Sequence, residues 1–167
     1  MNTLKTLKTV VAKKDYLNAK AEFEKKPWLT RIWLTITGRK PKDPTPGKSI
    51  DELATAFTAE YNRNKGFGPK MEFDDGYVST EVKYNQDTFL PVLVITMYIY
   101  KFGCFFMERK KFNEDGRYDE WGIAYPYSEC GVSGLPNDIP ASMSTMVKAY
   151  RCALNDLSSV VREATNR

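Results

Sequence analysis

Residues 70–84, KMEFDDGYVSTEVKY, carry a repeat of two that sets the class of the fold. Two sets of side chains alternate there, with Val78, Thr80, Val82 and Tyr84 in one and Ser79, Glu81 and Lys83 in the other. A period of two is typical of a strand with one face buried and the other in water. The preceding Asp75-Gly76 pair is typical of a tight hairpin turn, whose central residues need positive φ. We therefore predict an antiparallel hairpin of residues 71–74 and 77–84, with the Val78 set facing inward.

Further strand candidates follow this hairpin after short turns. Residues 90–100 are apolar on both faces, as expected of a central strand, and residues 104–112 and 118–125 come next. Consecutive strands joined by short turns form an antiparallel meander. The segment 88–107 is also about as long as a membrane span. Pro91, Lys101 and Gly103 interrupt it, so we favour the hairpin.

Two strong helix patterns flank the predicted strands. Ser49 and Glu52 have the spacing of a capping box, and Gly66 is a typical terminator, so residues 49–65 should form a helix. A second apolar stripe at helical spacing runs from Met143 to Ala164. We therefore predict an α+β fold: an antiparallel meander of four to five strands, flanked by an upstream helix and a long C-terminal helix.

The charge of the chain changes sign at its proline cluster, residues 41–46. Residues 1–48 hold 12 Lys/Arg against 4 Asp/Glu, whereas residues 49–167 hold 13 against 17. An amphipathic helix pattern covers residues 3–26, and residues 28–37 suit either a helix or a strand. We predict a basic helical N-terminal arm with a Pro-rich linker over 1–48 and a single α+β domain over 49–167.

Composition excludes several classes of chemistry. The chain has no histidine, which excludes Ser-His-Asp and Cys-His catalysis and histidine metal sites. Its three cysteines form no Cys-x-x-Cys pair, which indicates reduced thiols rather than a disulfide framework. Lysines from Lys5 to Lys26 interrupt any signal-peptide core. We expect a cytoplasmic protein, in the host cytoplasm if it is phage-encoded, with no enzymatic activity, cofactor or metal.

Candidate binding residues cluster around the two N-terminal tryptophans. They are Lys25, Lys26, Trp28, Arg31, Trp33, Arg39, Lys40 and Lys42. Cations of this kind could contact phosphates while an indole stacks on a base. The same composition suits an acidic protein or an anionic membrane face. In a further alternative, the tryptophans simply pack on the domain while the lysines face water.

Aromatic residues of the predicted strands form a second candidate interface. They are Tyr98, Tyr100, Tyr118, Trp121 and Tyr125. Aromatic side chains anchor many protein interfaces. They also pack between strands and in cores, and that alternative stays open.

Asp75 followed by Glu81-Val82-Lys83 resembles the acidic and Glu-x-Lys elements of the PD-(D/E)xK nucleases. The resemblance implies carboxylates that hold a divalent metal and a lysine that orients the attacking water. In the alternative interpretation, Glu81 and Lys83 are an exposed salt pair on the strand surface.

From these patterns we expect a non-catalytic binding protein, either an inhibitor or an assembly or accessory factor. A protein partner is the first expectation, nucleic acid the second, and a homo-oligomer remains open, whereas we do not expect a membrane partner. A nucleic-acid-binding accessory protein is the alternative function, and a metal-dependent nuclease is the second alternative.

Overall fold

The computed structural model describes residues 3–102, 104–125 and 139–166, with side chains except at 102, 104–106 and 120–125. Its helices are α1 (Thr3–Glu24), α2 (Trp28–Ile36), α3 (Ile50–Lys65) and α5 (Ser144–Thr165), with short 3₁₀ turns at Tyr100–Phe102 and Ala141–Met143. Its strands are β1 (Met71–Phe73), β2 (Gly76–Tyr84), β3 (Pro91–Ile99), β4 (Cys104–Phe112) and β5 (Tyr118–Tyr125). The predicted α+β class is confirmed.

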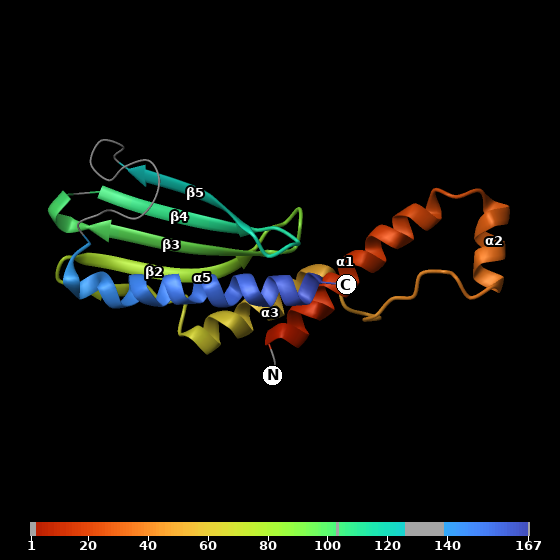
Figure 1. The fold of residues 1–167 in the computed structure, drawn as a ribbon, viewed down its shortest axis with the longest axis horizontal. Coiled ribbons are helices and arrows are strands. Elements are labelled where there is room, and N and C mark those ends of the chain that lie inside the picture. The colour runs from red at the N-terminus through yellow and green to blue at the C-terminus, as the bar shows by residue number, and fades with distance from the viewer. Residues whose placement is uncertain (1–2, 103, 126–138, 167) are drawn as a thin grey trace.

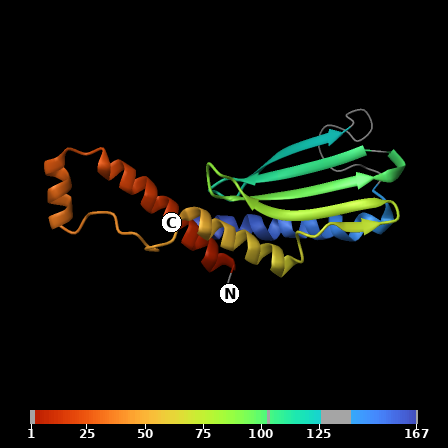
Figure 2. The ribbon, with the colours of Figure 1, turned by 180° about the vertical axis from the view of Figure 1, so that it is seen from behind.

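The five strands form one antiparallel sheet in the order β1-β2-β3-β4-β5, so the predicted meander is confirmed. Helices α3 and α5 lie along the same side of this sheet (Figure 1). The view from behind shows that α1 crosses α3 and lies close to both α3 and α5 (Figure 2). Within the segment 88–107, residues 91–99 lie in β3 and residues 104–107 in β4, as the hairpin interpretation predicted.

The first hairpin turns one residue earlier than its sequence predicts. Phe73 pairs with Gly76, so the two turn residues are Asp74 and Asp75. Gly76 lies in β2 beside β3, where an added Cβ would come within 1.9 Å of the carbonyl oxygen of Tyr98. A glycine is therefore required here because the neighbouring strand approaches closely. The sequence does not reveal this tertiary constraint, because an Asp-Gly pair is also typical of a hairpin turn.

The inward face of the sheet is the predicted one. Val78, Thr80 and Val82 are buried, and β3 adds Leu93 and Ile95 to the same core. On the opposite face of β3, Val92 and Val94 are also buried. Thr96 and Tyr98 on that outer face are only partly buried, so β3 is covered fully on its inner face and in part on its outer face.

Helix α3 begins and ends where its local sequence predicts. The hydroxyl of Ser49 accepts from the backbone N–H of Glu52 at 3.1 Å, and the Glu52 carboxylate accepts from the N–H of Ser49 at 2.7 Å. These reciprocal bonds satisfy two backbone donors that a helix start leaves open. Asn62 then exchanges two hydrogen bonds with the backbone of Val82, at 2.9 and 2.7 Å, and so fixes α3 against β2.

The first half of α1 belongs to the core. Leu7 and Val10 are almost fully buried and join the same hydrophobic cluster as residues of α3 and α5, such as Phe57 and Leu157. Lys14 forms an ion pair of 2.8 Å with Glu114, in the turn between β4 and β5. From Leu17 onward the helix is largely exposed. We call residues 17–42, which stand away from the body, the projecting arm.

Candidate interaction site on the projecting arm

The base of the arm is held by a buried lysine. The Lys13 ammonium lies 2.7 Å from the Asp43 carboxylate and donates to the carbonyl oxygen of Thr45 at 3.2 Å. Lys13 is only 5% exposed, so its charge needs these partners. The hydrogen bond from Lys13, with one from the backbone N–H of Thr45, holds the pKa of Asp43 below its usual range. The two ends of the arm are therefore clasped where it meets the body.

The arm is an extension of α1 that folds back along the proline segment. Helix α1 continues past the body, the chain turns at Pro27, and α2 lies across the outer end before residues 37–48 return (Figures 1 and 2). Pro27 sits at the N-cap of α2, where its missing N–H costs no hydrogen bond. The result places α2 at the extremity of the molecule, far from the sheet.

Helix α2 exposes a row of large apolar side chains. They are Trp28 at 62%, Leu29 at 62%, Ile32 at 47%, Trp33 at 53% and Ile36 at 78%. Their spacing of one, four, five and eight residues puts them on one side of a helix with 3.6 residues per turn. No residue of α2 is buried. The helix therefore has an amphipathic face without any covering element in the described part of the chain.

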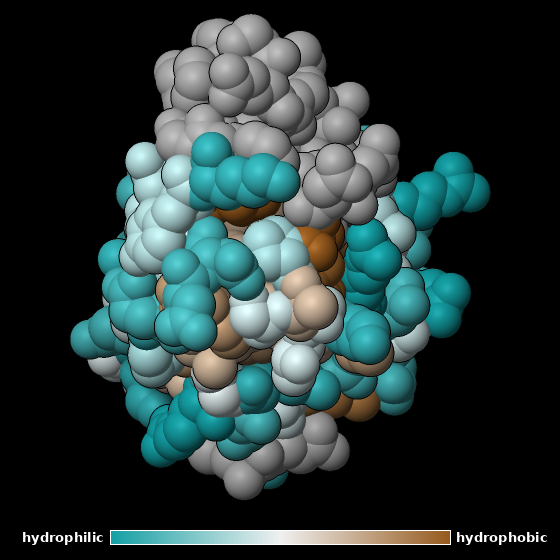
Figure 3. Space-filling model, turned by 90° about the vertical axis from the view of Figure 1, so that its left-hand side faces the viewer, coloured by the Kyte–Doolittle hydropathy of each residue, from teal (hydrophilic) through white to brown (hydrophobic). Residues whose placement is uncertain are grey.

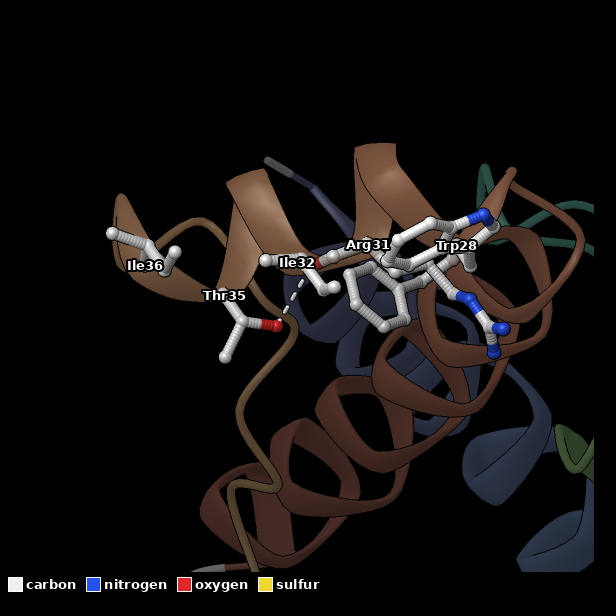
Figure 4. A pocket seen from close by; sticks show the side chains of 6 residues that line it. Trp28, Arg31, Ile32, Thr35 and Ile36 are labelled. Atoms are coloured by element: carbon white, nitrogen blue, oxygen red, sulfur yellow. Dashed lines mark hydrogen bonds between the residues drawn. The ribbon is translucent and has the colours of Figure 1, made fainter.

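A shallow hollow of about 320 Å³ lies against this face, lined by Phe23, Trp28, Arg31, Ile32, Thr35 and Ile36. Figure 4 shows Trp28, Ile32 and Ile36 in succession along α2, with Thr35 beside them. The Thr35 hydroxyl donates to the carbonyl oxygen of Arg31 at 2.8 Å, so this polar group is satisfied within the helix. The hollow consequently offers mainly apolar contact.

Cations outnumber carboxylates around the apolar face. Residues 25–42, which we call the arm tip, hold six Lys/Arg and no Asp/Glu. Lys25 pairs with Glu22 at 2.7 Å, on the neighbouring turn of α1. The guanidinium of Arg39 lies 5.3 Å from the ring centre of Trp33, within cation–π range. The arm tip is therefore both apolar and strongly basic.

Seven of the eight residues predicted for a basic binding segment lie in or beside α2, and the eighth, Lys42, lies next to Asp43 at the clasp. Sequence reasoning did not include Leu29, Ile32 and Ile36 in that set. The signal was present, since these residues continue the helical spacing of the tryptophans. An amphipathic face is usually buried, however, and the sequence alone does not show that this one is left uncovered by the described residues.

The aromatic residues predicted for a sheet interface do not share one surface. Tyr98 stacks on Tyr77 with ring centres 5.6 Å apart, and Tyr100 packs edge-on to Tyr98 at 5.7 Å. Tyr100 is half exposed and donates to Glu72 at 3.1 Å, and this bond raises the pKa of Tyr100. Tyr118 instead packs beside Phe112, against the core. The side chains of Trp121 and Tyr125 lie outside the described part of the structure.

The residues that resemble a nuclease motif do not converge. Glu81 and Lys83 form an exposed ion pair of 2.8 Å, and Asp75 accepts from the Ser142 hydroxyl at 2.6 Å. Asp75 precedes β2 and Glu81 lies six residues farther along, a distance of about 20 Å at about 3.3 Å per residue. Among the described residues, no group of three or more acidic or cysteine side chains could hold a metal ion.

The rest of the surface offers weaker candidates. Among the described residues at the end of the body opposite the arm, polar side chains predominate, with small apolar areas between them (Figure 3). A hollow of about 400 Å³ on the outer sheet face mixes Lys83, Arg109 and Lys111 with Glu81 and Asp87. Such mixed charge does not select one class of ligand.

Comparisons with known proteins add no functional assignment. The sequence matches no family model, and searches among curated proteins and solved structures found no relative. Across the described ranges, no helix combines the length and apolarity that crossing a bilayer requires.

Proposed function

We propose that this chain is a non-catalytic binding protein that engages a macromolecular partner through its arm tip. The observation that carries the proposal is the exposure of five large apolar side chains on the nine residues of α2. Burying a side chain of this size is worth about 1.5–3 kcal/mol, and contiguous apolar patches on a folded surface commonly mark interaction sites. An inhibitor or an assembly factor in the cytoplasm, including a host cytoplasm, fits such a surface.

The stability of the body does not depend on this surface. The core of the described residues includes no residue of α2, because its buried apolar residues come from α3, α5, the sheet, the first half of α1 and the short segments that connect them. The clasp of Lys13 and Asp43 also holds the arm at its base and leaves the arm tip outside. The exposed face therefore has a role other than internal packing.

A nucleic-acid-binding accessory function is the second candidate. The six cations of the arm tip favour it, because lysine and arginine neutralise backbone phosphates. Leu29, Ile32 and Ile36 weigh against it, since such aliphatic side chains gain little from a phosphate backbone.

The test compares two double variants of the full chain as immobilised baits in a lysate of the source cell. Leu29→Ser with Trp33→Ser removes apolar surface from the arm tip. Met71→Ser with Tyr100→Ser removes two large side chains of comparable exposure from the sheet end, 42% and 50%. Retained protein, nucleic acid and phospholipid are each quantified against the unaltered chain.

We expect the arm-tip variant to lose at least about tenfold of one retained component, and the sheet-end variant to keep it. The opposite pattern would move the interface to the tyrosines of the sheet and contradict the proposal. Equal retention by all three baits would also contradict it.

A further inference from the structure

We infer that the surface contacted by the arm tip is an anionic lipid bilayer, on which α2 lies flat as an interfacial helix. The inference rests on the binding role proposed for the arm tip and replaces the macromolecular partner by a lipid surface. It differs from the sequence-based expectation, which was a protein partner and no membrane partner, because the sequence left the covering of the tryptophans open and the structure leaves them exposed.

The apolar face has the composition of an interfacial helix. Two of its five members are tryptophans, which favour the boundary between headgroups and acyl chains. The others, Leu29, Ile32 and Ile36, are aliphatic and suit the acyl region. Helix α2 has nine residues, far fewer than a span needs, so it can lie on a bilayer but not cross it.

Cations flank both ends of α2. Lys25 and Lys26 precede the helix and Arg39 and Lys40 follow it, whereas Lys42 lies farther back, beside the clasped Asp43. Long basic side chains at the ends of an apolar face can reach anionic headgroups while that face is buried. Five cations in or beside α2, against Glu22 and Glu24 on the last turns of α1, leave the outer end of the arm with a net positive charge that complements an anionic surface.

The shape of the molecule permits this contact. Helix α2 lies across the outer end of the arm, and the body is at the other end of α1 (Figures 1 and 2). A flat surface can therefore meet α2 before it meets the sheet. The clasp between Lys13 and Asp43 keeps both chain segments of the arm together as they leave the body.

Other partners use this surface less completely. A nucleic-acid duplex offers phosphates to the cations but little to three exposed aliphatic side chains. An acidic protein would need an apolar groove that is also ringed by carboxylates. A bilayer supplies the negative charge and the apolar layer together, at the depth that an interfacial helix reaches.

The test measures binding of the full chain to large unilamellar vesicles by co-sedimentation. One set of vesicles is pure phosphatidylcholine, and the other holds about one-third phosphatidylglycerol. The variants are Leu29→Ser with Trp33→Ser, Lys26→Gln with Lys40→Gln, and the control Met71→Ser with Tyr100→Ser. A duplex DNA oligonucleotide and polyglutamate serve as competing anionic probes.

We expect at least about tenfold tighter binding to the anionic vesicles than to the neutral ones. The apolar double variant should lose at least about tenfold, the lysine variant about 25-fold at about fivefold per cation, and the control less than about twofold. Raising salt from about 0.1 M to about 0.5 M should weaken binding, because the headgroup contribution is screened.

Three results would overturn the inference: no preference for anionic vesicles, vesicle binding that survives the Leu29→Ser/Trp33→Ser change, or DNA or polyglutamate binding that is tighter than vesicle binding. If vesicle binding fails while retention from the lysate still depends on the arm tip, the lipid inference falls and the proposed function stands. If both fail, both are wrong.

Discussion

Replacement of Leu7 by alanine tests whether the first half of α1 is part of the folded core. Leu7 has no exposed surface and lies in the cluster shared by α3, the sheet and α5. Losing about three methylene equivalents at about 0.8 kcal/mol each costs about 2.4 kcal/mol of transfer free energy. The cavity left behind raises the expected loss to about 3–4 kcal/mol, inside the usual range of about 2–5 kcal/mol for such changes.

The matched control is Leu29→Ala, which makes the same chemical change in α2. Leu29 is 62% exposed, so its truncation should cost less than about 1 kcal/mol. Helix propensity favours alanine slightly at both positions and therefore cancels in the comparison. The two variants should differ by at least about 2 kcal/mol in the free energy of unfolding.

Urea unfolding followed by far-UV circular dichroism provides the assay. With a slope of about 2 kcal/mol per M, Leu7→Ala should lower the midpoint by about 1.5–2 M at an unchanged slope. A loss below about 1 kcal/mol for Leu7→Ala would refute the reasoning, because it would mean that α1 is detached from the body. A loss of similar size for Leu29→Ala would mean that α2 packs internally.

Three further predictions concern single contacts. The pKa of Asp43 is lowered chiefly by its bond from Lys13, so this pair stabilises the fold above about pH 4, and the stabilisation is lost as the pH falls through the folded pKa. The difference in free energy of unfolding between the unaltered chain and Asp43→Asn should therefore narrow below about pH 4. Urea unfolding at several pH values measures this difference. Gly76→Ala should cost about 3 kcal/mol or more, because its Cβ would collide with the Tyr98 carbonyl. Ser49→Ala should cost about 1 kcal/mol through loss of the helix cap, measured by thermal or urea unfolding.

Each of these changes has a contrasting outcome. A stability gap for Asp43→Asn that stays constant down to about pH 2 would show that the carboxylate is not held by Lys13. Gly38 has a φ of 71° and open space around it, so Gly38→Ala should lower the free energy of unfolding by only about 1 kcal/mol. Equal losses of stability for Gly38→Ala and Gly76→Ala would argue against the close approach at Gly76. Ser159→Ala, in the middle of α5 on its exposed side, is the control for Ser49→Ala.

Local patterns predicted the elements well. The helix of residues 49–65 was predictable because its cap, apolar stripe and terminating glycine all lie within its own sequence. The inward set of β2 was predictable because alternation is local as well. The turn before Gly76 was misplaced by one residue, since the constraint on this glycine comes from β3, more than twenty residues away.

The candidate site was predictable in charge but not in exposure. The cations of the arm tip follow from composition alone. The apolar stripe of residues 3–26, by contrast, has the same pattern in its buried half, at Leu7 and Val10, and in its exposed half, at Leu17. Only tertiary contacts separate the two halves, among them the ion pair between Lys13 and Asp43, thirty residues apart.

The emission of Trp28 and Trp33 tests most directly whether the apolar face of α2 enters an anionic bilayer. A Trp121→Phe background leaves these two indoles as the only tryptophans of the chain. Both are more than half exposed, so their emission in buffer should be that of indoles in water and should be quenched readily by acrylamide. Anionic vesicles should shift the emission to the blue and protect it from the quencher. Emission and quenching that remain unchanged at saturating vesicle concentration would contradict the account.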